Sequence, residues 1–236
     1  MKIEPFLRAM HKNECNQTKD FLYPRQKEEL AKHRKFLSKY KDGLYIKNPV
    51  TYTINHLGYR TRDDIPTTDY ILAVGCSHTF GIGLHEEHRF TNLLEDFYKV
   101  PVLNVSIPGG SPNSVRDNII QLLSSDTCLP KLVILQWPSD TRLTFGLQNL
   151  GPWARRDLYY ARFVALNKDN ISLYSKIAKE QTPRLLTKHG IPFISFDMKE
   201  REKHFFLDVA NDRDHSGIEG NKLVFEHLKE QIDAIL

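Results

Sequence analysis

Residues 70–83 read YILAVGCSHTFGIG, and this stretch decides the fold class of the chain. Its first five residues form a continuous apolar run, which is typical of a strand buried on both faces of a sheet. Gly75 ends the run, and Ser77 follows two residues later. Sites in open α/β sheets form at the carboxyl ends of the strands. The stretch therefore predicts a central parallel strand with a candidate functional serine at its end.

The same alternation of apolar runs and helical patterns continues to the C-terminus. We expect further strands at 100–105, 132–136 and 191–196, with helices at 89–98, 111–123, 170–189 and 218–236. Pro183 is expected either to kink the third of these helices or to begin a separate one. Strands separated by helices predict right-handed βαβ units, and hence an α/β fold whose parallel sheet carries helices on both faces.

Residues 1–43 differ from the rest and are interpreted as a basic helical extension of an α/β domain that spans residues 44–236. Lys and Arg outnumber Asp and Glu there by five, and residues 25–41 carry a thin apolar stripe that ends at a turn signal, Asp42-Gly43. A strand is expected just afterwards, at 50–54. Because no recognition motif accompanies the charge, we interpret it as a solvated helix face and expect no nucleic-acid partner. An assembly or homo-oligomer contact through residues 1–43 stays open.

Composition excludes several protein classes. A chain of 236 residues with 40% hydrophobic and 26% charged residues is typical of one soluble globular domain. No apolar run approaches the roughly 18 residues that span a bilayer, and charges interrupt the N-terminus, so neither a membrane span nor a secretory signal is expected. Three cysteines that form no even or closely spaced set argue against a disulfide framework and against a zinc site built on paired cysteines. These features predict a cytoplasmic protein.

Residues suited to acyl transfer follow the other strands. The second strand runs into Gly109 and Gly110, whose backbone N–H groups suit an oxyanion, and the third runs into residues 136–140, QWPSD. Asp212 precedes His215 by three residues at the start of the last helix, a spacing at which a carboxylate can orient an imidazole; Asp214 is the competing orienter. A nucleophile, a base, an orienter and an oxyanion hole are thus all expected at one edge of the sheet.

Four segments, taken in order, resemble the signature blocks of the SGNH/GDSL hydrolase family. Gly75-Cys76-Ser77 is similar to the first block, residues 104–109 to the second, residues 137–140 to the third and Asp212-Arg213-Asp214-His215 to the fourth. Residues 53–60, TINHLGYR, also resemble the Asn-x-x-Gly-[Phe/Tyr]-Arg strand that precedes the first block in many members. The resemblance covers about residues 50–236. It implies a three-layer α/β/α, flavodoxin-like fold and an oxyanion hole at Ser77 and Gly109.

Two positions depart from that pattern. Cys76 replaces an acidic residue that has no catalytic role, and the resulting Gly-Cys-Ser-His-Thr variant resembles members from phage and marine bacterial genomes. Ser139 stands where the family has an oxyanion-hole Asn, and losing one such donor costs about 10²–10³ in rate. Ser139 or the amide of Gln136 is expected to replace it.

The function expected from these residues is ester hydrolysis, with an O-acetyl group on a carbohydrate as one candidate substrate. Ser77 is the nucleophile, His215 the base and Asp212 the orienter, and neither a metal nor an organic cofactor is required. His78, Trp137 and Arg142 are expected to contact substrate, although a packing role for Trp137 is equally open. An O-acyltransferase with the same site and a non-catalytic SGNH-like binding module, virion-associated if phage-encoded, are the alternatives.

Overall fold

The computed structural model describes residues 17–21, 50–56, 58–62, 68–145, 148–150, 158–197, 208, 210 and 215–235. Its centre is a four-stranded sheet in the order β4-β3-β5-β8, in which every neighbouring pair is parallel. The strands are β3 (Ile71–Val74), β4 (Val102–Asn104), β5 (Leu132–Trp137) and β8 (Phe193–Asp197). Numbered along the chain, the order is 2-1-3-4, as in flavodoxin-like doubly wound sheets. The predicted α/β fold class is confirmed.

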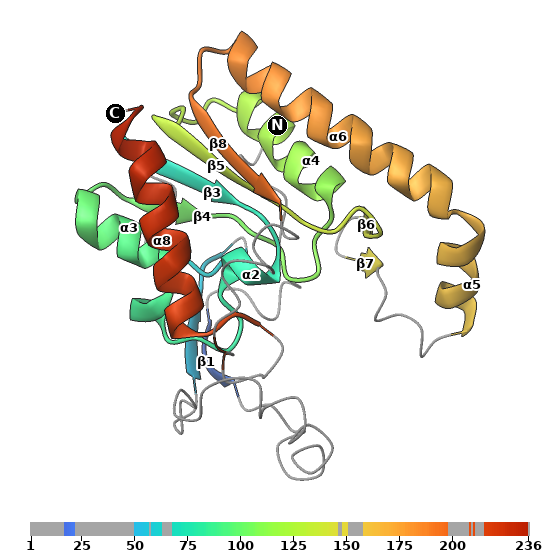
Figure 1. The fold of residues 1–236 in the computed structure, drawn as a ribbon, viewed down its shortest axis with the longest axis horizontal. Coiled ribbons are helices and arrows are strands. Elements are labelled where there is room, and N and C mark those ends of the chain that lie inside the picture. The colour runs from blue at the N-terminus through green and yellow to red at the C-terminus, as the bar shows by residue number, and fades with distance from the viewer. Residues whose placement is uncertain are drawn as a thin grey trace.

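Two pairs of helices cover the two faces of this sheet (Figure 1). The first pair is α4 (Pro112–Leu123) and α6 (Lys168–Lys188), and the second is α3 (Phe90–Tyr98) and α8 (Ile218–Asp233). Alternate residues of β3 separate cleanly: Leu72 and Val74 pack in the cluster that includes α4 and α6, while Ile71 and Ala73 pack in the cluster that includes α3 and α8. Burial on both faces explains why the strand is a continuous apolar run.

The elements predicted from residue 50 onward are confirmed to within three residues at each end, including β2 (Val50–Ile54). One alternative is wrong: Pro183 lies inside a continuous α6 and does not begin a separate helix. Gly190, two residues beyond the end of α6, has a φ of 68°, which suits glycine as a helix terminator.

Some elements were not expected. Within residues 1–43, Gln17–Phe21 form strand β1, which pairs antiparallel with β2, so the helical interpretation is wrong at these five residues. The predicted helix at 25–41 lies outside the described residues, and the boundary at residue 43 stays a prediction. The other additions are the four-residue helix α2 (Ser77–Phe80), an antiparallel pair of β6 (Leu143–Phe145) and β7 (Gln148–Leu150), a helix α5 (Leu158–Leu166) and a short 3₁₀ turn, η2 (Glu86–His88).

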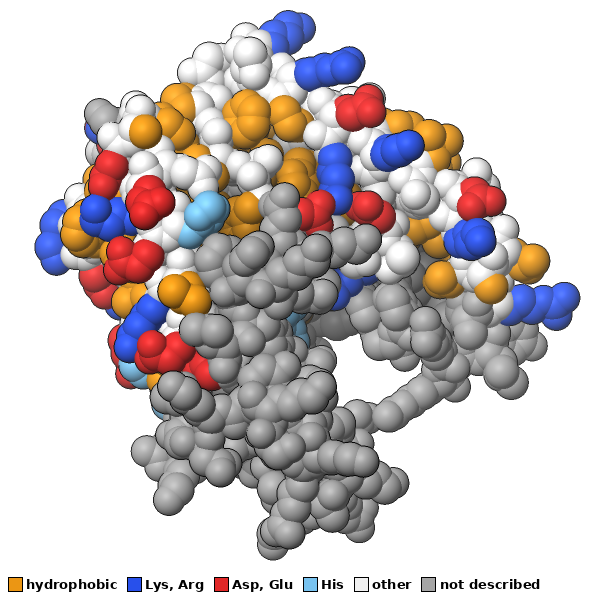
Figure 2. Space-filling view, viewed as in Figure 1, with side chains coloured by type: hydrophobic (Ala, Val, Ile, Leu, Met, Phe, Trp, Pro, Cys, Tyr) orange, Lys and Arg blue, Asp and Glu red, His pale blue; other side chains and the backbone are white. Residues whose placement is uncertain are grey.

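Acidic and basic side chains are interspersed over α3, α8 and α6 on the face that Figure 2 shows. Among the helices of the described ranges, none combines the length and the apolar character needed to cross a membrane.

Candidate active site

Ser77 and His215 meet at the carboxyl edge of the sheet. Ser77 is the first residue of α2 (Ser77–Phe80), a four-residue helix that follows β3, and its Oγ lies 2.8 Å from His215 Nε2. The two residues are 138 positions apart in the chain. The Ser77 side chain is buried, with 6% of its surface exposed, whereas His215 is part-buried. The predicted nucleophile and base are therefore in direct hydrogen-bond contact.

The turn into α2 requires glycine at position 75. A Cβ there would lie 2.4 Å from Thr79 Oγ1 and 2.8 Å from Gln136 Oε1, distances that atoms in contact do not reach. Because Gly75 leaves this space empty, α2 can close directly over the end of β5. Cys76, the residue before Ser77, is fully buried and its Sγ contacts Gln136 Oε1 at 3.2 Å. The thiol thus points into the interior toward Gln136, and the hydroxyl of Ser77 is the group that meets the imidazole.

Gln136 contacts the turn that carries Ser77, residues 75–79, which we call the nucleophile turn. Its Oε1 accepts hydrogen bonds from Cys76 N (3.2 Å), Cys76 Sγ (3.2 Å) and Thr79 Oγ1 (3.1 Å), and its Nε2 donates to Trp137 O (2.9 Å). The side chain is fully buried. One N–H of the amide is thus used by the Trp137 carbonyl, and the expectation that Gln136 supplies an oxyanion donor stays a prediction.

Other buried polar groups hold the far end of α2. Asn104 Nδ2, at the end of β4, donates to Thr79 O at 2.7 Å. The Arg60 guanidinium donates to Gly81 O and to Leu84 O, each at 2.6 Å, and Arg89 Nη1 donates to Arg60 O at 2.7 Å. Burial lowers the pKa of Arg60 to about 10, which leaves it charged at neutral pH.

The contacts of Arg60 give the segment at residues 53–60 a structural role. Asn55 Oδ1 accepts a hydrogen bond from Tyr59 N at 2.9 Å, and Gly58 adopts a φ of 87° in the turn between them. The turn sends the Tyr59 ring into the core and directs Arg60 to the loop after α2. The motif therefore supports the nucleophile turn from outside the central sheet.

The predicted oxyanion residues lie at the start of α2 (Ser77) and on the loops that follow β4 (Gly109) and β5 (Ser139). Ile107 N donates to Gly75 O at 3.0 Å, which ties the loop after β4 to the nucleophile turn, and Gly109 follows with a φ of 73°. No described residue accepts a hydrogen bond from Gly109 N–H. Ser77 N–H, in the first position of α2, has no acceptor within its own helix. Ser77 N–H and Gly109 N–H are thus two candidate backbone donors, and their pairing as an oxyanion hole stays a prediction.

Ser139 lies on the loop after β5, the strand on the other side of β3. Its Oγ contacts Thr141 Oγ1 at 3.0 Å, so the hydroxyl already has a local partner. The next residue, Asp140, forms an ion pair with Lys179 of α6 at 2.7 Å, and Ser175 Oγ donates to Asp140 O at 3.1 Å. This loop is thereby anchored to α6.

The segment that carries His215 is shaped by Asp208, a residue that the sequence alone did not indicate. Asp208 is 3% exposed, and its carboxylate accepts hydrogen bonds from Glu219 N (3.1 Å) and Gly220 N (2.9 Å) in the first turn of α8. Ala210 N donates to His215 O at 2.8 Å. A carboxylate at a helix N-terminus is favourable, and here it fixes the start of α8 just beyond the imidazole. Asp212 and Asp214 lie outside the described residues.

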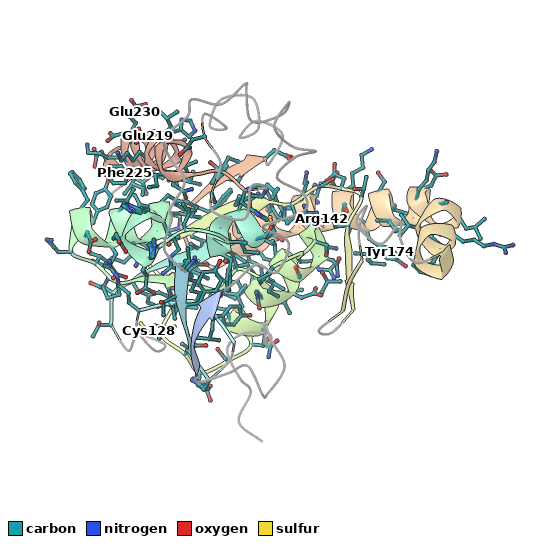
Figure 3. The ribbon with its side chains drawn as sticks, turned by 90° about the horizontal axis from the view of Figure 1, so that it is seen from below. Cys128, Arg142, Tyr174, Glu219, Phe225 and Glu230 are labelled. Carbon is teal, nitrogen blue, oxygen red and sulfur yellow. The ribbon has the colours of Figure 1, made fainter. Side chains whose placement is uncertain are left out.

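The three residues expected to contact substrate have different surroundings. The His78 ring lies against the His215 ring, with 8% of the residue exposed. Trp137 is 5% exposed and packs in the core cluster with α4 and α6, and a contact with substrate stays a prediction. Arg142 is part-buried, and Figure 3 places it on the side of α2 that faces α6.

No family model matches the chain, and no curated protein matches it. Solved structures do show similarity to it. A lipolytic protein of the G-D-S-L family from Veillonella parvula is 16% identical with a TM-score of 0.38, covering 69% of this chain and 97% of that one. A psychrotrophic esterase from a Pseudoalteromonas species is 17% identical with a TM-score of 0.39, covering 70% and 97%. A lipase/acylhydrolase from Enterococcus faecalis is 14% identical with a TM-score of 0.38, covering 70% and 96%. Identities of this size say nothing of substrate or reaction.

Proposed function

We propose that this chain is a serine hydrolase of the SGNH type that cleaves carboxylic esters, with Ser77 as nucleophile and His215 as general base. The observation that carries the proposal is the 2.8 Å contact between Ser77 Oγ and His215 Nε2 at the carboxyl edge of a parallel sheet. A hydroxyl in contact with an imidazole is the pairing that nucleophilic acyl transfer needs. The four sequence blocks that resemble the family lend independent support.

The reaction proceeds in two steps. In the first, neutral His215 removes the proton from Ser77 Oγ as that oxygen attacks the ester carbonyl, and the imidazolium then returns the proton to the leaving alcohol. In the second, His215 activates a water molecule that attacks the acyl-serine and releases the carboxylic acid. Nε2 serves as the base when Nδ1 carries the ring proton.

Asp212 is proposed to hold that Nδ1 proton, on the strength of its spacing from His215. The carboxylate of Asp208, the nearby acid that the structure describes, is already engaged by two N–H groups of α8. Asp208 therefore positions the helix that follows the base.

The oxyanion is proposed to bind the N–H groups of Ser77 and Gly109. Ser139 can add a third donor if its hydroxyl turns from Thr141 toward the substrate, because a hydroxyl reorients by rotation about one bond.

The test uses short p-nitrophenyl esters and a fluorophosphonate probe. Ser77→Ala is expected to lower kcat by at least about a thousand-fold, because loss of the nucleophile leaves only binding and oxyanion stabilisation. The probe should label the wild type and not the variant. Ser124→Ala is the matched control, because Ser124 is an exposed serine at the end of α4 whose Oγ bonds Ile120 O. Equal turnover by wild type and Ser77→Ala, both folded by circular dichroism, would remove the proposed nucleophile.

The acyl acceptor and the substrate are tested in the same assay. We propose an O-acetylated carbohydrate as substrate, and acetylated sugars therefore stand beside the aryl esters in the panel. Addition of a free sugar acceptor separates hydrolysis from acyl transfer, because transfer yields an acylated sugar in place of free acid. A folded wild type that turns over no ester but retains a glycan would instead favour a binding module.

A further inference from the structure

Gln136 contacts the nucleophile turn on both sides of Ser77. The backbone N–H that it accepts belongs to Cys76, the residue before Ser77, and the hydroxyl that it accepts belongs to Thr79, two residues after it. We propose that Gln136 is a positioning residue for the nucleophile: it sets the place of the Ser77 Oγ and N–H relative to His215 without touching substrate. The proposal rests on the proposed function of Ser77.

The amide is chemically suited to this position. One carbonyl oxygen must accept from three donors, the Cys76 N–H, the Cys76 S–H and the Thr79 O–H, while the adjoining nitrogen must donate to the Trp137 carbonyl. A neutral amide carries an acceptor and a donor on one short planar group. A carboxylate would lack the donor and would add a charge to a fully buried site, which is costly.

The strand that carries Gln136 makes the contact rigid. β5 pairs directly with β3, with Leu135 opposite Val74, so Gln136 stands beside the point where β3 gives way to the nucleophile turn. Gly75 leaves room for the amide, because a side chain there would approach Gln136 Oε1 to 2.8 Å. Gly75 and Gln136 thus act together: Gly75 has no side chain, and the Gln136 amide oxygen occupies the space that one would need.

The position of Ser77 matters because displacement of a reacting group by about 1 Å can cost about 10² in rate. Loss of the amide leaves the Cys76 N–H and the Thr79 O–H without their acceptor inside the protein, and the turn must then shift to satisfy them. The consequence falls on kcat, since substrate binding does not involve Gln136.

The experiment compares Gln136→Met, which keeps the shape but removes the polar atoms, with Asn118→Leu. Asn118 is a second fully buried amide, on α4, bonded to Tyr59 and to Val105 O, so its loss reports the general cost of removing a buried amide. We expect Gln136→Met to lower kcat about 30- to 100-fold with KM within about threefold of wild type. Asn118→Leu should lose a similar amount of stability yet keep kcat within about threefold.

Thr79→Val is the second variant, used in case Gln136→Met does not fold, because it removes one donor to the same oxygen without removing the amide. It should lower kcat about 3- to 10-fold and slow fluorophosphonate labelling of Ser77 by a similar factor. Wild-type kcat in either folded Gln136→Met or Thr79→Val, alongside Ser77-dependent turnover by the wild type, would overturn the positioning role and leave the proposed function standing. Equal kcat losses in Gln136→Met and Asn118→Leu would also overturn it. A wild type without Ser77-dependent turnover would remove the proposed function itself, and this inference with it.

Discussion

The imidazole rings of His78 and His215 lie with their centroids 4.6 Å apart and their planes inclined at 53°. His78 is the residue next to the candidate nucleophile, and it is 8% exposed. Its ring therefore packs directly against the ring of the candidate base. A side chain in such contact limits the rotamers open to His215 and helps to keep Nε2 directed at Ser77 Oγ.

Two substitutions of His78 separate ring packing from polar chemistry. His78→Ala removes the ring that packs against His215 and is expected to lower kcat/KM about tenfold, because the His215 imidazole is then less well oriented. His78→Phe keeps an aromatic ring against His215 and should stay within about threefold of wild type. The pH profile of kcat/KM measured on both variants checks the result. A Phe variant as impaired as the Ala variant would show that the polar atoms of His78, and not its ring, matter.

The loop that presents His215 depends on a close approach between Asp208 and Gly217. A Cβ on Gly217 would lie 2.2 Å from Asp208 Oδ2, and that carboxylate is already committed to two N–H groups of α8. Gly217→Ala therefore forces the carboxylate from the helix terminus. We expect it to destabilise the fold by about 2–4 kcal/mol, combining overpacking with loss of a cap.

Gly190→Ala is the matched control for this substitution. Gly190 has a φ of 68° but no atom within 4 Å of the added Cβ, so the change costs backbone strain alone, about 1 kcal/mol. Urea unfolding of both variants gives the comparison. An equal loss in the two would mean that Asp208 moves aside freely, contrary to the role assigned to its two hydrogen bonds.

Alkaline pH should weaken the fold through Tyr59. Burial raises the pKa of Tyr59 well above its ordinary value, although the hydrogen bond to Asn118 opposes this shift. Because the folded pKa exceeds the unfolded one, the contribution of this hydroxyl is fully present below pH 10 and is lost as pH rises above it. At pH 11 the loss amounts to about 1.4 kcal/mol.

Tyr59→Phe should remove that dependence, at the cost of one hydrogen bond at neutral pH. Urea unfolding between pH 8 and pH 11 measures it, with Tyr174→Phe at an exposed position on α6 as the control (Figure 3). A slope of stability against pH that is identical in wild type and Tyr59→Phe would contradict the prediction.

Much of the fold could be read from local pattern. The apolar runs of β3 and β5 require burial on both faces, and that requirement holds whatever the neighbouring strands are. Ser77 and His215 could likewise be predicted as site residues, because Ser77 follows a buried strand and His215 precedes the last helix. The strand at Gln17–Phe21 was missed because its partner, β2, lies about 30 residues later, and the isolated segment carries no strong alternation.

The amino-acid sequence by itself determined the alternation of strands and helices, and with it the edge of the sheet where a serine and a histidine could meet. Tertiary structure alone decided the partners of the buried polar groups: that the Gln136 amide turns toward Cys76 and Thr79, and that Asp208 holds α8 beyond the imidazole. The physical reason is the distance along the chain over which each feature is set. Periodic burial is a property of neighbouring residues along the chain, whereas the direction of a hydrogen bond depends on groups that only folding brings within 3 Å.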